Sequence, residues 1–222
     1  MAGTSSRRRF SEHKHRRGEW NTATSAVNSP VLRACAGFLS PKRRLIDHLA
    51  TDTGQGKTVL DVGAGTGAYA QWFLGRRACT VVAVDWAAEA LRRIVPPKRG
   101  RVLAVCADIR QLPFKAEVFD SVYSVDTLGH VAEPERCLDE MVRVAVPGAS
   151  LMLHSECCDY RRRWPDRALI RKAGRDLPAE LDGHITLRSS RELRHAYVQR
   201  FRLRSFFSPA GYLGWLIGYP EK

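Results

Sequence analysis

The fold is decided by one stretch of the sequence, Thr58-Val-Leu-Asp-Val-Gly-Ala-Gly-Thr-Gly-Ala-Tyr-Ala70. An apolar run ends in glycines at three alternate positions, Gly63, Gly65 and Gly67, and residues 68–74 suit a helix. This pattern predicts a buried parallel strand, a tight glycine turn and the first turn of a helix. Glycine permits positive φ and a close backbone approach, and the turn offers N–H groups at a helix N-terminus. The stretch therefore predicts a binding site for an anionic or electron-rich group.

Two nucleotide-binding interpretations of this stretch compete, beside a glycine turn without a ligand. Gly63, Gly65 and Ala68 satisfy the dinucleotide fingerprint G-x-G-x-x-A, and Asp85 has about the spacing of its ribose-binding acid. The other interpretation is Asp-x-Gly-x-Gly-x-Gly, beginning at Asp61. With Asp61 in place, the stretch resembles the first motif of class I S-adenosylmethionine-dependent methyltransferases, in their small-molecule, type 11-like branch. A carboxylate beside the turn repels a pyrophosphate but attracts the ammonium and sulfonium of S-adenosylmethionine.

Acids also follow the next two predicted strands. Residues 80–85 end in Asp85, and the strand predicted over 101–107 is followed by Asp108 and Ile109. Asp85 suits the ribose hydroxyls, while its alternative role is to cap the following helix. The resemblance implies that Asp108 meets the adenine amino group and that Ile109 stacks on the ring. The implied cofactor is S-adenosylmethionine, with S-adenosylhomocysteine as product, and the implied cofactor-binding residues are Asp61, Gly63, Ala64, Gly65, Gly67, Asp85, Trp86, Asp108, Ile109 and Val125.

The resemblance implies an α/β fold, a Rossmann-like doubly wound sheet of about seven strands. The strands are mostly parallel with the last antiparallel, and helices cover both faces. Outside the first three strands, the predicted strands are 119–125, 150–155, 201–207 and 212–219, and the predicted helices include 41–49, 87–95 and 190–198. Residues 126–131 and 143–149 resemble the family's Leu-x-His turn and Arg-Val-Leu-x-Pro-Gly-Gly, with Ala145 and Ala149 as departures.

The length of 222 residues suits one α/β domain. Residues 1–18 are basic and are predicted to be a disordered tail. The rest, 19–222, is predicted to be a single methyltransferase domain. Its predicted parts are N-terminal cap helices (19–50), a cofactor-binding core (58–155), a substrate-side insertion (156–187) and a C-terminal helix with strands (188–222).

The net charge is +13 and the pI is about 10.0, which permits nucleic acid, anionic lipid or an acidic substrate as partner. No apolar run approaches a transmembrane segment, and no secretory signal is visible. Glu12 and Glu19 count against a mitochondrial transit peptide, so the expected location is the cytoplasm. The six cysteines form no C-x-x-C pair, and His154, Cys157 and Cys158 lack a fourth ligand, so no metal site is predicted.

Methyl transfer is an in-line displacement. It needs a general base only when the acceptor atom carries a proton that it cannot lose unaided. His130, after the fourth strand, is the candidate catalytic residue, with a structural role as the alternative. On the substrate side the candidates are Trp20, His154, Tyr160 and Trp164.

The turn after the fourth strand lacks the Pro-Pro and Pro-Cys motifs of base-modifying enzymes, which favours a small-molecule O-, N- or C-acceptor. An RNA or nucleic-acid-associated methyltransferase that uses the basic tail is the first alternative. A non-catalytic cofactor-binding partner subunit is the second, and the sequence leaves the oligomeric state open.

Overall fold

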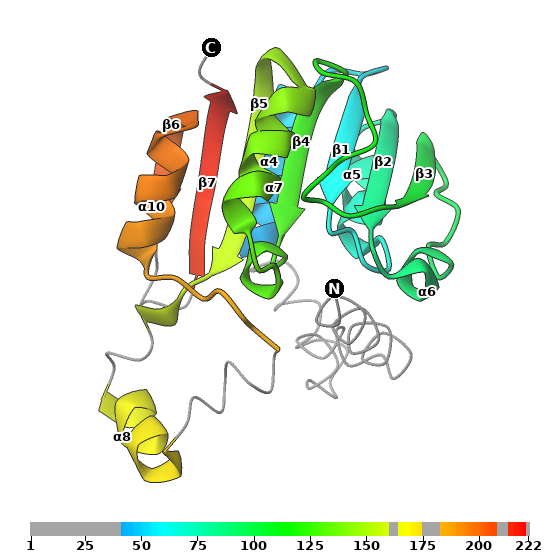
Figure 1. The fold of residues 1–222 in the computed structure, drawn as a ribbon. Coiled ribbons are helices and arrows are strands. Elements are labelled where there is room, and N and C mark those ends of the chain that lie inside the picture. The colour runs from blue at the N-terminus through cyan, green and yellow to red at the C-terminus, as the bar shows by residue number, and fades with distance from the viewer. Residues whose placement is uncertain (1–40, 160–163, 175–182, 208–212, 221–222) are drawn as a thin grey trace. The chain divides into compact units, whose positions relative to one another are not determined.

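The structure is a computed structural model that describes residues 41–159, 164–174, 183–207 and 213–220 (Figure 1). The predicted tail 1–18 and residues 19–40 of the predicted cap therefore lie outside the described residues. The chain divides into two compact units, Met1–Ile109 and Arg110–Lys222. The prediction of one methyltransferase domain over 19–222 stays a prediction.

The first unit contains three parallel strands in the order β3-β2-β1. Its elements are α4 (Pro41–Asp52), β1 (Thr58–Val62), α5 (Ala68–Arg76), β2 (Thr80–Asp85), α6 (Ala88–Leu91) and β3 (Arg101–Cys106). Val59 pairs with Val81, which in turn pairs with Val102. The strands β1 and β2 are buried along nearly their whole length, as expected for the continuous apolar runs of a parallel sheet covered on both faces.

The second unit contains four strands in the order β4-β5-β7-β6. Its elements are β4 (Phe119–Val125), the 3₁₀ turn η2 (Leu128–His130), α7 (Pro134–Val144), β5 (Ala145–Glu156), α8 (Trp164–Ala173), α10 (Ser190–Val198), β6 (Phe201–Phe207) and β7 (Leu213–Pro220). The strands β4 and β5 are parallel, whereas β7 runs antiparallel to both β5 and β6. The predicted α/β fold with a mostly parallel set of strands, flanking helices and an antiparallel last strand is confirmed.

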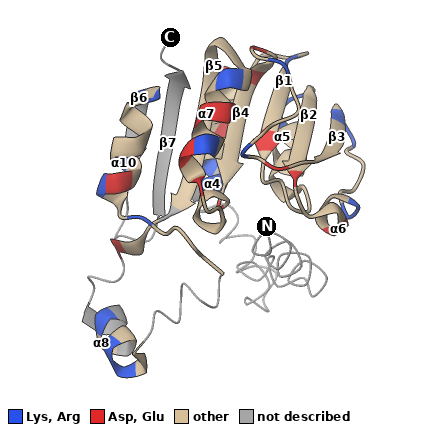
Figure 2. Cartoon of the chain, in the orientation of Figure 1, with Lys and Arg blue, Asp and Glu red and all other residues tan. Residues whose placement is uncertain are grey.

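Helix α7 shows why this sequence forms a helix that packs on one side. Cys137, Leu138, Met141 and Val144 follow helical spacing and are all buried. The other side of α7 carries both signs of charge (Figure 2). Carboxylates on α7 or at its start pair with arginines from several places in the unit, and these pairs are Arg110–Glu133, Arg136–Glu133, Arg143–Glu140, Arg188–Glu135 and Arg200–Asp139.

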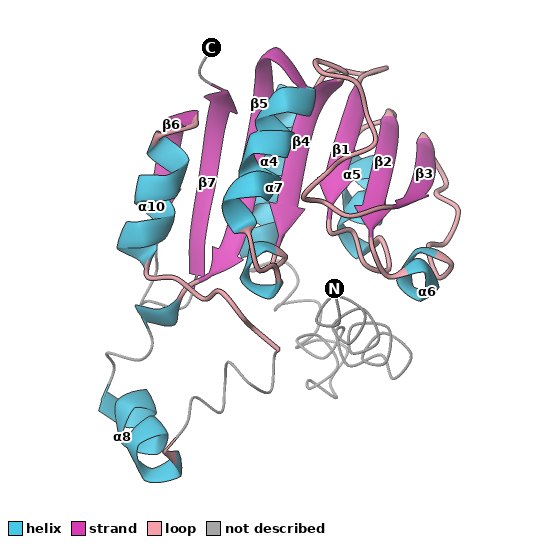
Figure 3. Cartoon of the chain, viewed as in Figure 1, coloured by secondary structure: helices cyan, strands magenta, loops and turns pink. Residues whose placement is uncertain are grey.

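Two predicted boundaries were wrong by more than three residues, the end of α6 and the start of β5. Figure 3 shows the helices and strands of the structure. The helix predicted over 87–95 ends at Leu91, because the chain tightens into i→i−3 bonds, from Arg93 N–H to the carbonyl of Ala90 and from Ile94 to Leu91. The fifth strand begins at Ala145 rather than Ser150. Ala145 of β5 pairs with Phe119 of β4, and the register between the two strands then shifts before Ser121 pairs with Ser150. Gly148, with a φ of 77°, lies in β5 between the two paired residues.

The substrate-side insertion, predicted over 156–187 without regular structure, contains helix α8.

Candidate functional site

The glycine turn of the first unit joins β1 to α5. Gly63, Gly65 and Gly67 have φ values of 78°, 54° and 73°, which side-chain-bearing residues rarely adopt. The N–H groups of Gly63 and Ala64 both donate to the carbonyl of Val84, at 2.8 and 2.9 Å. The turn is thereby fixed to the end of β2.

Gly67 is also required by packing. A Cβ at this position would lie 2.9 Å from Cγ1 of Ile94, which follows α6. A larger residue would require the Ile94 side chain to shift and would be strained at the φ of 73°.

Asp85 organises the site. Its Oδ2 accepts a hydrogen bond from Gly65 N–H at 2.9 Å, and its Oδ1 accepts one from Ala87 N–H at 2.8 Å. Burial raises the pKa of Asp85 above its usual range, and these N–H groups oppose that rise. The side chain thus holds both the glycine turn and Ala87, the residue before α6. Ala87 rather than Asp85 is the N-cap of α6, so the alternative role predicted for Asp85 was wrong. Each carboxylate oxygen has two acceptor positions, so ribose hydroxyls can still donate to it.

Three acids share one edge of the first unit. Asp61 lies in β1 beside Ala83 of β2, Asp85 ends β2 beside Cys106, and Asp108 follows β3. Asp61 and Asp85 are buried, and Asp108 is half-buried. The carboxyl ends of adjacent parallel strands meet at one edge, where open α/β sheets bind their ligands.

The first unit therefore brings together nine of the ten predicted cofactor-binding residues, with Ile109 buried and Trp86 half-buried. The tenth, Val125, is a buried residue of β4 in the second unit. These ten residues include three carboxylates and no Lys or Arg. A glycine turn with such acids fits an aminoacyl sulfonium nucleoside and does not fit a diphosphate, so the residues fit S-adenosylmethionine.

A carboxylate–imidazole pair lies at the end of β4 in the second unit. Nδ1 of His154 is 2.6 Å from Oδ1 of Asp126, and Asp126 N–H donates to the His154 carbonyl. The His154 side chain is fully buried, whereas that of Asp126 is 25% exposed. Asp126 has a positive φ of 54°, which is uncommon without glycine. Sequence reasoning missed Asp126, although its position directly after the fourth strand was the available signal.

His130 lies in η2 and is held by the segment 183–186. Its Nδ1 is 3.2 Å from the Gly183 carbonyl, and its ring stacks on His184 with centroids 4.5 Å apart. Ile185 and Thr186 both donate backbone N–H groups to the carbonyl of Gly129. The end of the predicted insertion is thus fastened to the turn that carries His130.

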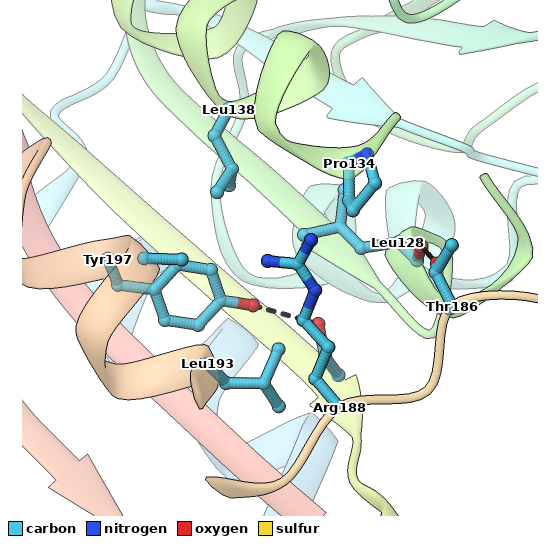
Figure 4. Close-up of a pocket in the computed structure, with 10 residues that line it drawn as sticks. Leu128, Pro134, Leu138, Thr186, Arg188, Leu193 and Tyr197 are labelled. Atoms are coloured by element: carbon cyan, nitrogen blue, oxygen red, sulfur yellow. Dashed lines mark hydrogen bonds between the residues drawn. The ribbon is translucent and has the colours of Figure 1, made fainter. Parts of the chain in front are cut away.

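A pocket in the second unit lies between η2, the start of α7, residues 186–188 and α10 (Figure 4). The apolar lining includes Leu128, Pro134, Leu138 and Leu193. Its polar side chains already have protein partners. Thr186 donates to the carbonyls of Leu128 and Val131, Arg188 pairs with Glu135, and the hydroxyls of Tyr197 and Ser155 lie 3.0 Å apart. Burial raises the pKa of Tyr197 to about 12, so this phenol stays protonated. The pocket consequently has the character of a packing gap.

The structure describes only some of the residues predicted to lie on the substrate side. Trp20 and Tyr160 lie outside the described residues, and Trp164 is the first residue of α8. His154 is buried against Asp126. The roles assigned to these residues and to His130 stay predictions.

Among the described residues, no group of three or more His, Cys, Asp and Glu side chains is arranged to hold a metal ion. None of the helices in the described ranges has the length and apolar character needed to cross a membrane.

Residues 60–153 match the family described as "Methyltransferase domain". The chain is 33% identical to phosphatidylethanolamine N-methyltransferase of Cereibacter sphaeroides over 123 residues, 51% of this chain and 56% of that protein. It is 35% identical to demethylmenaquinone methyltransferase of Thermobifida fusca over 108 residues, 47% of this chain and 45% of that protein. The chain spans about half the length of the curated relatives it matches.

The crystal structure of the N-methyltransferase NodS from Bradyrhizobium japonicum, in complex with S-adenosyl-L-homocysteine, has the same fold. The TM-score is 0.59 at 16% identity, over 82% of this chain and 86% of that chain.

Proposed function

We propose, from the premise that this chain belongs to the class I S-adenosylmethionine-dependent methyltransferases, that it methylates a small-molecule O-, N- or C-acceptor. S-adenosylmethionine is the cofactor of this family and, when bound, supplies a methyl group on an activated sulfonium. The protein's task is then to hold the cofactor, position the acceptor and exclude water.

The observation that carries the proposal is the Asp85 carboxylate, buried and fixed by two backbone N–H groups at the end of β2. In this proposal Asp85 accepts the ribose hydroxyls, and Asp61 with the glycine turn holds the aminoacyl end. Asp108 and Ile109 bind the adenine. The absence of basic side chains from this set supports S-adenosylmethionine over a dinucleotide.

The cofactor site is tested by thermal stabilisation with S-adenosylmethionine, S-adenosylhomocysteine and NADH. A ligand that binds only the native state raises the melting temperature, by about 5–10 °C for a chain of this size at 100 times Kd. We expect shifts with the first two ligands and none with NADH. We expect Asp85→Asn to lose the shift, while Glu89→Gln, a matched exposed carboxylate on α6, retains it.

A shift with NADH alone would contradict the proposal, and so would an unchanged shift in a folded Asp85→Asn variant. If no ligand stabilises the native protein, the non-catalytic subunit becomes the better explanation.

The acceptor is sought next with a panel that starts from phosphatidylethanolamine and demethylmenaquinone, because similar domains carry those names. Two candidate bases are then compared, His130 and the half-buried carboxylate of Asp126. Removal of a general base typically lowers kcat by about 10²–10⁴-fold. If His130 is the base, we expect this loss of kcat in His130→Gln and not in Asp126→Asn. The reverse result would assign the role to Asp126.

A further inference from the structure

The basic side chains of α8 have no acidic partners among the residues that the structure describes. Between residues 161 and 175 the sequence holds seven Arg or Lys and one acid, Asp166. Within α8, the side chains of Arg167, Arg171 and Lys172 are exposed. Among the described residues, no carboxylate forms an ion pair with any of these three.

Helix α7 of the same unit differs from α8 in this respect. The four carboxylates at and along α7, from Glu133 to Glu140, are paired with arginines. The acids of α7 are thus used locally, whereas Lys and Arg (blue) recur along α8 (Figure 2). A cluster of this kind attracts an anionic partner.

The pattern of α8 favours a lipid surface over a nucleic acid. Arg167 and Arg171 are one turn apart, about 6 Å along the helix axis, and Lys172 follows directly. Ala168 is exposed among these cations, while Ile170 and Ala173 are half-buried. Half of the ten residues of α8 are apolar (Trp164, Ala168, Leu169, Ile170 and Ala173). A short helix that combines cations with apolar residues is typical of proteins that lie on an anionic bilayer.

We propose that the exposed α8 residues Arg167, Ala168, Arg171 and Lys172, which we call the α8 surface, dock this protein onto an anionic lipid bilayer. The inference deepens the proposed function and rests on it, since it names the surface at which the acceptor is met. Helix α8 and the 183–186 segment belong to one connection, from β5 to α10. That segment fastens to the His130 turn, so docking through α8 places the membrane at the connection that leads to this turn.

The test is flotation of the full chain with vesicles of phosphatidylcholine, with or without about 30 mol% phosphatidylglycerol. We expect binding to the anionic vesicles at about 0.05 M salt, little binding to pure phosphatidylcholine, and loss of binding near 0.5 M salt. The triple variant Arg167→Gln/Arg171→Gln/Lys172→Gln is expected to lower the partition constant on the order of 100-fold.

The matched control is Lys98→Gln/Arg99→Gln/Lys115→Gln, which removes the same charge from three other exposed sites. This variant is expected to retain binding within about threefold. Equal losses in both triple variants would overturn the proposal, as would equal binding to neutral vesicles or no binding to the anionic ones. Binding of a single-stranded RNA that depends on the α8 surface, without vesicle binding, would assign the surface to nucleic acid instead.

The thermal shift with S-adenosylmethionine is recorded for each variant. A preserved shift with lost vesicle binding supports the α8 proposal with an intact cofactor site. A missing shift in the native chain counts against the proposed function alone, because vesicle binding is read separately.

Discussion

Asp126 combines two features that rarely occur together without a reason. Its backbone is in the left-handed region, and its carboxylate contacts a fully buried imidazole. Left-handed φ costs little for Asp or Asn, because their short polar side chains bond locally. A buried polar group that loses its partner costs about 1–3 kcal/mol. The pair therefore holds the ends of β4 and β5 in register at the position where Val125 meets His154.

Two substitutions of Asp126 are expected to affect the free energy of unfolding differently. Asp126→Ala removes the acceptor and adds backbone strain, so we expect a loss of about 2–3 kcal/mol in the free energy of unfolding. Asp126→Asn retains an acceptor oxygen and tolerates the same φ, so its loss should be less than half as large. Urea unfolding measures both values. Asp126→Gly serves as control, because it relieves the backbone without restoring the hydrogen bond. Equal losses for Ala and Asn would refute the role assigned to the carboxylate.

At the level of elements, the start of α10 is held by a local interaction between Ser189 and Glu192. The Ser189 side chain accepts from Glu192 N–H at 3.3 Å, and Glu192 Oε2 accepts from Ser189 N–H at 2.8 Å. Both bonds of the capping box are present. The box satisfies N–H groups that the first turn of the helix leaves without partners.

We expect Ser189→Ala to lower the free energy of unfolding by about 1 kcal/mol. The matched control is Ser190→Ala, one residue further, where the hydrogen bond to the Asp159 carboxylate comes from the backbone N–H and is kept in the variant. This control is expected to change stability by less than about 0.5 kcal/mol. Denaturant unfolding of the two variants decides the matter, and equal effects would show that the box does not stabilise α10.

Sequence reasoning succeeded where the signal was local and failed where distant contacts decide. The bounds of β4 and β6 matched because alternating or continuous apolar runs end at polar residues. The early start of β5 was missed because Pro147 and Gly148 indicate a loop, whereas pairing with Phe119 keeps Ala145 in the strand. The Asp126–His154 pair was missed because it depends on neighbouring strands, 28 residues apart in sequence.

Over the whole molecule, ion pairs of equal length differ in what surrounds them. Glu140 with Arg143 and Glu89 with Arg92 both have i,i+3 spacing and a 2.6 Å contact. Glu140 is 18% exposed and also accepts Leu112 N–H, whereas Glu89 is 41% exposed. Exposed pairs contribute little because water and salt screen them. Arg143 in turn donates to the carbonyls of Leu112 and Phe114, so the pair secures the segment that follows β3.

The difference in exposure between Glu140 and Glu89 predicts that the two carboxylates contribute differently to the pH dependence of stability. The hydrogen bond from Arg143 lowers the pKa of Glu140 below its ordinary 4.5. A carboxyl with a depressed folded pKa stabilises the protein fully above its ordinary pKa, and this contribution is lost as the pH falls through the lower value. We expect Glu140→Gln to cost about 1 kcal/mol near pH 7 and to reduce the loss of stability below pH 4.5.

Glu89→Gln is the control, with an expected change of less than about 0.5 kcal/mol at either pH. The melting temperature measured from pH 7 to pH 3 compares the two variants. Parallel curves for Glu140→Gln and the native chain would contradict the assignment.

At the proposed cofactor site, the two hydrogen bonds of Asp85 have a consequence for the kinetics of binding. Asp85 holds the glycine turn and the residue before α6 without help from a ligand. The conformational entropy of ordering this backbone is therefore lost when the chain folds, not when a ligand binds. An incoming cofactor then meets a preorganised site and orders little backbone. Such a site captures its ligand without a slow rearrangement, so the residence time of the cofactor, rather than its rate of entry, sets the affinity.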